Sequence, residues 1–309
     1  MTRLAFLGTP EVAAVVLRAL HGAGHQVALV VTAPDRRRGR GSALVPTAVK
    51  QCAAELGLPL SDRIADVLGA RIELGVVVAF GSIIRRDVLA EVPMVNLHFS
   101  LLPRWRGAAP VERAILAGDE RTGVCLMALD EGLDTGPVFA RVETQVHAEE
   151  TAAELRSRLA DLGASLLIER LAGGVATLGT AEPQVGGPLY AAKIKRSELQ
   201  LVWERPAIEL GRLVRVGRAW TTFRGKRLIV EGARVVGATP GGDRSAAGLP
   251  SGELPTGELP ATGTLLGDEV VCGEGRLELL EVRPEGRSAQ SFDSWQRGAR
   301  VAVGERLGG

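Results

Sequence analysis

Three short apolar runs separated by segments of helical periodicity constrain the fold of this chain more than any other feature. The runs are Leu4–Leu7, Gln26–Thr32 and Gly75–Phe80, and apolar residues recur at helical spacing over residues 12–19. The third run is apolar on both faces, as strands of a covered parallel sheet are. Strands that alternate with helices predict an α/β domain with a doubly wound parallel sheet.

The same alternation continues beyond these runs. Val95–His98 is predicted as a strand that leads into a long loop, and Ala108–Ala117 as a helix with a proline in its first turn. Gly123–Leu129 and Val138–Val146 are strand candidates, and residues 151–171 have the pattern of an amphipathic helix.

After this helix the sequence loses its clear periodicity, which indicates a boundary between two domains. We predict a first domain over residues 1–184, a linker over 185–203 and a second, smaller domain over 204–309. The second domain has one helical segment, Ala207–Arg218, and then short β-like runs without intervening helices, which indicates a small β-barrel. Residues 237–262 are rich in Gly, Pro and Ser, so we interpret them as a flexible surface insertion.

Composition excludes several classes of protein. Lys and Arg number 37 against 36 Asp and Glu, which excludes a polybasic binder but leaves room for a local basic patch. No stretch approaches the ~18 apolar residues of a membrane span, and residues 8–11 interrupt the N-terminal apolar run. We therefore expect a cytoplasmic protein without membrane association. The three Cys and four His lack metal-ligand spacing, so we expect no metal.

Two polar residues at the end of the fourth strand are candidates for acyl-transfer chemistry. Asn96 and His98 are two residues apart, so their side chains lie on the same face of a strand. Asn can donate to a developing oxyanion, and His can move a proton from an attacking amine. Asp134, on a loop bracketed by Gly132 and Gly136, could orient that imidazole. The alternatives are a buried structural pair and an ordinary turn Asp.

Several motifs occur together in the first 200 residues. They are Asn-Leu-His at 96–98, Ser-Leu-Leu-Pro-Arg-Trp-Arg-Gly-Ala-Ala-Pro at 100–110, Leu-Asp-Thr-Gly at 133–136 and Phe-Leu-Gly-Thr-Pro-Glu at 6–11. In these motifs the chain resembles the N10-formyltetrahydrofolate-dependent formyltransferases. The resemblance is dense to about residue 200 and thin afterwards.

The resemblance implies an enzyme with a Rossmann-like catalytic domain followed by an OB-like, tRNA-binding barrel. It implies that Asn96, His98 and Asp134 are catalytic, and that the folate lies against Ser100, Leu101, Leu102 and Pro103. The formyl donor is then N10-formyltetrahydrofolate. The acceptor is the α-amine of methionine on initiator tRNA, and we expect a monomer.

Two basic segments agree with a tRNA partner. Between residues 35 and 50 there are five basic residues and one acid. The resemblance implies that this loop enters the acceptor arm of tRNA and matches Arg40 to a basic residue of the family. The charge of the loop adds Arg36, Arg37 and Arg38 as predicted tRNA contacts. Residues 205–234 contain eight basic residues against two acids. The alternative is arginine on solvated faces.

The sequence departs from the family at Phe99, where a glycine is frequent, and at Ile84-Arg85, at the edge of the folate pocket. Three other functions stay open. One is a sugar-nucleotide amine formyltransferase, which differs in the molecule that presents the amine. Another is a folate-dependent hydrolase with water as acceptor, and the third is an RNA-binding module with a degenerate first domain. A dinucleotide-dependent dehydrogenase is excluded, because the first turn lacks the glycine fingerprint.

Overall fold

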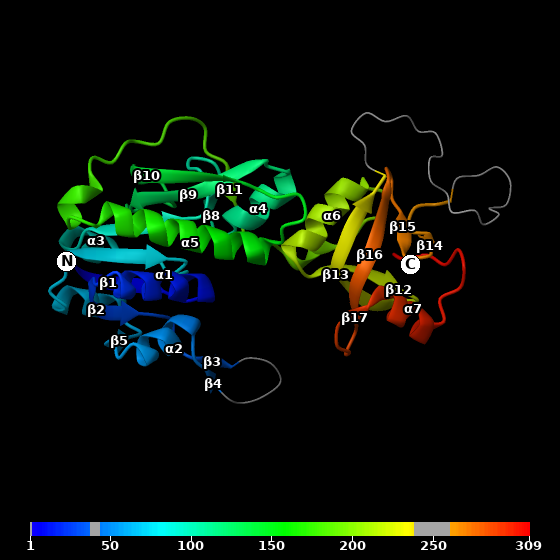
Figure 1. The fold of residues 1–309 in the computed structure, drawn as a ribbon, viewed down its shortest axis with the longest axis horizontal. Coiled ribbons are helices and arrows are strands. Elements are labelled where there is room, and N and C mark those ends of the chain that lie inside the picture. The colour runs from blue at the N-terminus through cyan, green and yellow to red at the C-terminus, as the bar shows by residue number, and fades with distance from the viewer. Residues whose placement is uncertain (1, 38–43, 238–259) are drawn as a thin grey trace. The chain divides into compact units, whose positions relative to one another are not determined.

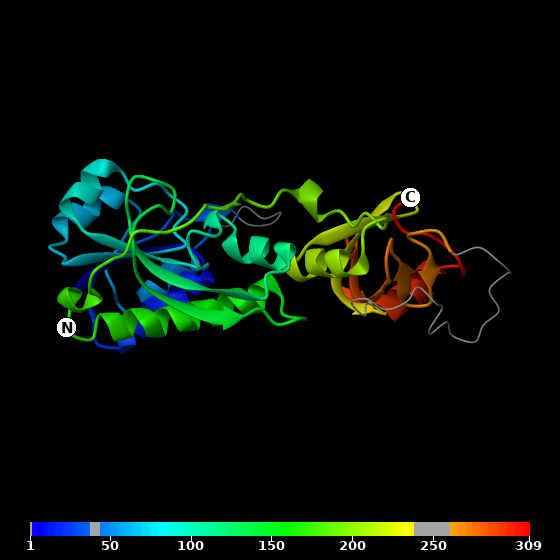
Figure 2. The same ribbon diagram turned by 90° about the horizontal axis from the view of Figure 1, so that it is seen from above.

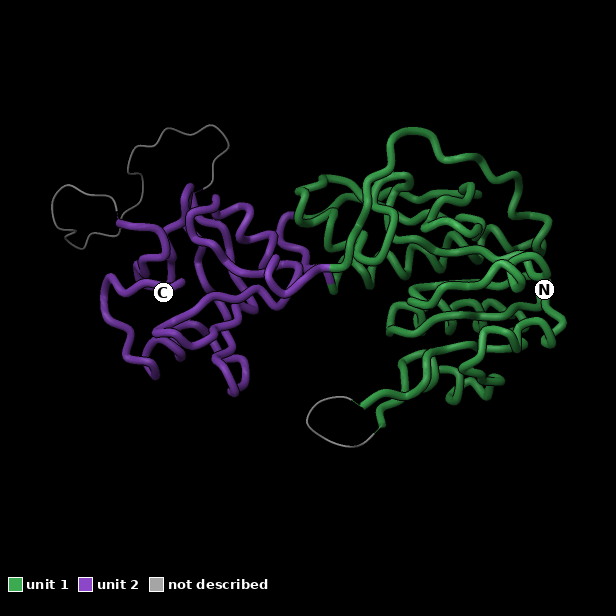
Figure 3. The backbone as a smooth tube through the Cα atoms, turned by 180° about the vertical axis from the view of Figure 1, so that it is seen from behind, with its two compact units in different colours: residues 1–147, 153–193 green, residues 148–152, 194–309 purple. Residues whose placement is uncertain are grey.

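The computed structural model describes residues 2–37, 44–237 and 260–309, which form two compact units (Figure 3). One unit holds residues up to 147 together with 153–193, and the other holds 148–152 and 194–309. The first is an α/β unit and the second is a separate antiparallel β unit, as predicted. None of the described helices is long and apolar enough to cross a bilayer.

The first unit is built on a seven-stranded sheet of order β10-β9-β7-β6-β1-β2-β5 (Figure 1). The five strands from β7 to β5 are parallel, β9 is antiparallel to β7, and β10 is antiparallel to β9. The strands are β1 (Arg3–Gly8), β2 (Gln26–Val31), β5 (Leu60–Ser61), β6 (Leu74–Val78), β7 (Met94–His98), β9 (Arg121–Ala128) and β10 (Val138–Gln145).

Helices α1 (Glu11–Gly22) and α5 (Ala152–Arg170) cover one face of this sheet (Figure 2). Gly8 of β1 leaves room for Ala13 of α1, because a Cβ at Gly8 would lie 2.7 Å from the Ala13 Cβ. Gly163 of α5 lies over β7 and β9, where a Cβ would lie 3.3 Å from Leu97 and 3.2 Å from Val124. Small residues therefore bring both helices close to the sheet.

The opposite face is covered in part by the 3₁₀ helix Ile64–Gly69 and by α3 (Arg86–Glu91). Val67 and Val88 from these elements join a buried cluster with Leu7 and Val77. Beyond that cluster, Leu102 of the loop that follows β7 packs against side chains of β9 and β10. The members of this second cluster are Leu102, Cys125, Met127 and Val138.

The remaining elements of the first unit are short. Helix α2 (Ala48–Glu55) begins where the Thr47 side chain accepts a hydrogen bond from Lys50 N at 3.0 Å, and α4 (Pro110–Ala117) has its proline at the first helical position. A 3₁₀ turn spans Val175–Leu178, and the short strands are β3 (Arg36–Arg37), β4 (Leu44–Val45), β8 (Arg106–Gly107) and β11 (Tyr190–Ala191).

The segment predicted as a linker is divided between the two units. Its first part runs back over the first unit, where β11 pairs in parallel with β8. Its second part contains the 3₁₀ helix Arg196–Leu199, which belongs to the second unit. Most of the insertion predicted over 237–262 lies outside the described residues.

The second unit is an antiparallel sheet of order β12-β13-β16-β15-β14, with β17 paired to β16. Residues 305–308 join its two edges: Gly308 N donates to Thr222 O at 2.8 Å, and Leu265 N donates to Glu305 O at 2.8 Å. The sheet is thereby closed into a barrel. Its elements are α6 (Ala207–Val216), β12 (Ala219–Phe223), β13 (Lys226–Val236), β14 (Leu265–Leu266), β15 (Glu269–Val271), β16 (Arg276–Pro284), β17 (Gln290–Ser291) and α7 (Phe292–Ala299).

Candidate active site

His98 is the last residue of β7, at the carboxyl end of the parallel strands, where α/β proteins bind ligands. The residue is 5% exposed. Nε2 lies 2.8 Å from Trp105 O, and Nδ1 lies 3.6 Å from Asp134 Oδ2. Because a carbonyl oxygen can only accept, Nε2 carries the hydrogen of the first contact. Nδ1 therefore faces the carboxylate as the nitrogen that can gain or lose a proton.

Asp134 is brought to His98 by a main-chain contact with the loop after β7. Its Oδ2 accepts a hydrogen bond from Gly107 N at 2.8 Å. Gly107 has φ +119°, and a Cβ there would lie 3.0 Å from Ala191 O, so only glycine allows this approach. The structure thus brings together two of the three predicted catalytic residues.

The loop that carries Asp134 is shaped by Asp130 and two glycines. Asp130 Oδ1 accepts hydrogen bonds from Gly132 N at 3.1 Å and Thr135 Oγ1 at 2.7 Å. A Cβ at Gly132 would lie 2.0 Å from Thr135 Oγ1, and one at Gly136 would lie 1.9 Å from Ala128 O. The glycines that bracket Asp134 in the sequence are therefore required by the fold of the loop.

Asn96 lies on the same face of β7 as His98, because its neighbour in β9 is Met127 while that of His98 is Cys125. It is half-buried. Within the described residues no protein group forms a hydrogen bond with its side chain, so the amide is free to donate. An unpaired amide beside an imidazole–carboxylate pair is suited to a carbonyl that develops negative charge.

The four residues predicted to contact folate form the first turn after β7. Ser100 is fully buried and its Oγ donates to Arg104 O at 2.6 Å, so it holds the loop together. Leu102 is also buried, and its N–H points to Cys125 Sγ at 3.4 Å. Leu101 and Pro103 are half-buried and present the accessible part of this segment. The folate contacts stay a prediction.

Asp119 supports the same loop, although no sequence motif had pointed to this residue. Trp105 Nε1 donates to Asp119 Oδ2 at 2.7 Å, and Arg104 Nε donates to the same oxygen at 2.8 Å. The hydrogen bond to Asp119 raises the pKa of Arg104. These contacts hold Trp105, whose φ of +64° directs its carbonyl to His98. These hydrogen bonds join residues 14 and 15 positions apart in the sequence, so no local sequence pattern could predict the role of Asp119.

The predicted tRNA contacts are described in part. Arg36 and Arg37 form β3, which pairs with β4, and both are exposed. Arg38 and Arg40 lie outside the described residues. Lys50, from the same basic segment, is engaged with Asp35 at 2.8 Å. Arg36 and Arg37 form an exposed cationic pair on a short hairpin, and their contact with tRNA stays a prediction.

In the second unit, acids neutralise some of the basic residues of 205–234. Arg205, Arg224 and Arg234 pair with Glu209, Glu305 and Glu278. In the described part of the chain, Arg212, Arg218 and Lys226 have no acidic partner. Burial lowers the pKa of Arg215, and the charge of nearby Arg212 lowers it further. Arg212 within α6 and Arg218 just after it are thus uncompensated cations in the described part of this unit.

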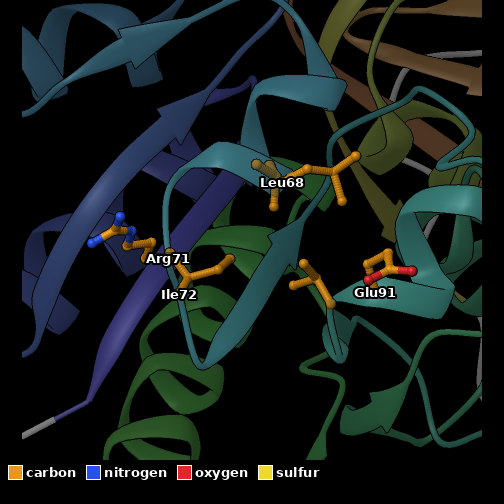
Figure 4. A pocket seen from close by; sticks show the side chains of 6 residues that line it. Leu68, Arg71, Ile72 and Glu91 are labelled. Carbon is orange, nitrogen blue, oxygen red and sulfur yellow. The ribbon is translucent and has the colours of Figure 1, made fainter.

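A separate cavity of about 380 Å³ lies between the 3₁₀ helix Ile64–Gly69 and α3 (Figure 4). Leu68, Ile72 and Glu91 are among its lining residues. It lies beside the segments that enter β6 and β7, at the opposite strand ends from His98. Among the described residues, no group of three or more His, Cys, Asp or Glu side chains could hold a metal ion.

Comparison with known proteins identifies the family. The formyl transferase model matches residues 2–171, and the model of the formyl transferase C-terminal domain matches residues 193–300. The chain belongs to the formyl transferase family. Both halves of this formyl transferase are matched, including the barrel in which the sequence motifs were thin.

Two relatives match this formyl transferase over nearly the full length of both chains. The methionyl-tRNA formyltransferase of Halorhodospira halophila is 43% identical, covering 98% of each chain. That of Roseobacter denitrificans is 39% identical, covering 98% of this chain and 97% of its own. An N-formyltransferase of Helicobacter canadensis, solved with folinic acid and dTDP-3-aminofucose, shares the fold at a TM-score of 0.65 and 14% identity. The match covers 90% of this chain and 98% of that one.

Proposed function

We propose that this protein transfers the formyl group of N10-formyltetrahydrofolate to the α-amine of methionine esterified to initiator tRNA. The observation that carries the proposal is the arrangement of Asn96, His98 and Asp134 at the carboxyl end of β7, in a chain whose relatives of 39–43% identity are named methionyl-tRNA formyltransferase. The reaction forms a bond from the amine nitrogen to the formyl carbon and breaks the bond from that carbon to N10. One proton moves from the amine to N10.

The three side chains divide this work. The unpaired Asn96 amide donates a hydrogen bond to the oxygen that becomes negative as the amine attacks. His98 Nδ1 takes the amine proton, since Nε2 is held by Trp105 O at 2.8 Å. The Asp134 carboxylate, 3.6 Å from Nδ1, stabilises the imidazolium that results.

The two substrates are assigned to different surfaces. Folate is placed against residues 100–103, where Leu101 and Pro103 are half-buried. A folate as donor is supported by the Helicobacter canadensis N-formyltransferase, which was solved with folinic acid. The acceptor arm of tRNA is placed against the hairpin of Arg36 and Arg37 and the segment that follows it. In the second unit, Arg212 and Arg218, which have no acidic partner among the described residues, are proposed as further contacts for the tRNA backbone.

A transfer assay tests the acceptor. The protein is incubated with N10-formyltetrahydrofolate and either Met-tRNA, a panel of amino-sugar nucleotides, or neither. We expect rapid formylation of Met-tRNA, and slow consumption of the donor in the other two arms. Faster transfer to an amino sugar would replace this proposal with the sugar-amine function, and acceptor-independent consumption would indicate a hydrolase.

A further inference from the structure

A side chain from the segment after α5 reaches the Asp134 loop. Gln184 Nε2 donates to the main-chain oxygens of Asp134 at 2.9 Å and Gly136 at 2.8 Å. Its Oε1 accepts hydrogen bonds from Arg106 Nε at 3.0 Å and Arg106 Nη2 at 2.7 Å. Both donors and both acceptor positions of the amide are thus used.

These contacts close a ring around Asp134. Arg106 directly precedes Gly107, whose N–H donates to the Asp134 carboxylate at 2.8 Å. One side of the ring therefore fixes the main chain of Asp134, and the other side fixes its carboxylate. Asp134 has φ +52°, a left-handed conformation that is unfavourable for a non-glycine residue. The hydrogen bonds from Gln184 help to hold that conformation.

Gln184 is anchored on both sides along the chain. Before it, Glu182 and Val138 exchange main-chain hydrogen bonds of 2.8 and 2.9 Å. After it, Arg106 N donates to Leu189 O at 2.8 Å, and β11 pairs with β8. The amide is therefore a fixed support, unlike a surface glutamine that can rotate freely.

We infer that Gln184 is a positioning residue that holds the Asp134 carboxylate against His98 during formyl transfer. The inference rests on the proposed function. The geometry requires an amide at this position. A carboxylate would keep the contact with Arg106 but would place an oxygen without hydrogen against the carbonyls of Asp134 and Gly136.

The Gln184→Glu variant tests the inference with one added charge and almost no change of shape. We expect kcat with Met-tRNA to fall by roughly ten- to a hundredfold, because small displacements of a catalytic group cost that much. KM for both substrates should stay the same, and amide hydrogen exchange over residues 130–136 should accelerate. Gln296→Glu is the matched control, since it also removes a donor to a main-chain carbonyl, Gly267 O, but in the second unit. Its kcat should equal that of the wild type.

A double variant separates positioning from general stability. Adding Gln184→Glu to Asp134→Asn should cost no further activity, because the amide acts through the carboxylate. An additive loss, or a normal kcat in the single variant, overturns the inference.

Gln184→Met serves the same comparison if the charged variant does not fold. A wild type inactive with Met-tRNA refutes the proposed function instead, whereas unchanged exchange over 130–136 refutes the support by Gln184 for any acceptor.

Discussion

At the residue scale, His98 lies between two groups that can only accept hydrogen bonds. Trp105 O is 2.8 Å from Nε2, and Asp134 Oδ2 is 3.6 Å from Nδ1. A neutral imidazole has one N–H and can satisfy only the first, while the imidazolium has an N–H for each. The ring can therefore receive a proton from the substrate amine without leaving its place.

We expect Asn96→Ala to lower kcat by on the order of a hundredfold or more, as loss of one oxyanion donor does. The fold should tolerate the change, because in the described residues the Asn96 amide has no protein partner to lose. Single-turnover rates and a thermal melt measure the two effects. A near-normal rate would remove Asn96 from the chemistry.

Asp134→Asn should preserve the loop while removing its charge, because the amide oxygen can still accept from Gly107 N. We expect a large loss of kcat with unchanged folate affinity. Combining it with His98→Ala should be no worse than the worse single variant, since members of one catalytic unit are non-additive. Asp66→Asn is the control, because this carboxylate accepts a hydrogen bond from Ser61 Oγ away from the candidate site. Loss of folding in Asp134→Asn would indicate an ordinary turn residue.

The candidate site was predictable as far as local geometry reaches. The period of a strand places Asn96 and His98 on one face, and the structure has this arrangement. The contact of Asp134 with Gly107 spans 27 positions, and that of Gln184 with Asp134 spans 50. No periodicity encodes such contacts. The glycine-bracketed loop made Asp134 a candidate beside the alternative of a turn residue, the motif resemblance favoured the catalytic role, and nothing pointed to Gln184.

At the element scale, the first unit follows the sequence pattern closely where its strands are continuous apolar runs, as in β1, β2 and β6. In the barrel the predictions were less accurate. The helix predicted over Ala207–Arg218 ends at Val216, because Gly217 has φ +94° and leaves the helical conformation. Two of the short β-like runs predicted for this domain, residues 227–230 and 234–236, form one strand, β13, which has an irregular register at Gly232. β12 and α7 were not predicted.

The close packing of α5 against the sheet at Gly163 leads to a prediction for this element. Gly163→Val should destabilise the first unit by about 1–3 kcal/mol, because the added methyl groups meet Leu97 and Val124 in a filled space. Gly298→Val in α7 is the control, since nothing lies within 4 Å of its Cβ position. The midpoint of urea unfolding, followed by a probe in the first unit, measures the difference. Equal effects in the two variants would mean that packing does not limit residue 163.

At the scale of the whole molecule, a nearly neutral chain keeps separate regions of uncompensated positive charge. The totals of 37 basic and 36 acidic residues would give no preference for a polyanion. Pairing within the fold changes this, because acids bind Arg205, Arg224 and Arg234 and leave Arg212, Arg218 and Lys226 without acidic partners among the described residues. Charge distribution after folding, not composition, therefore decides whether tRNA is attracted.

The salt dependence of tRNA binding tests the predicted tRNA contacts of the basic segment that begins at Arg36. Replacing Arg36, Arg37, Arg38 and Arg40 by Ala should weaken binding for every tRNA sequence. Each lost phosphate contact should also reduce the steepness of log affinity against log salt by about 0.9 for duplex contacts. Folate affinity should not change, because the substitutions leave residues 100–103 intact. The control replaces Arg18 and Arg63, which are paired with Glu55 at 3.1 Å and Asp66 at 3.9 Å, and should leave the slope as it is. An unchanged slope and affinity in the fourfold variant would mean that these arginines are a solvated charge run, and the amino-sugar acceptor would then become the better proposal.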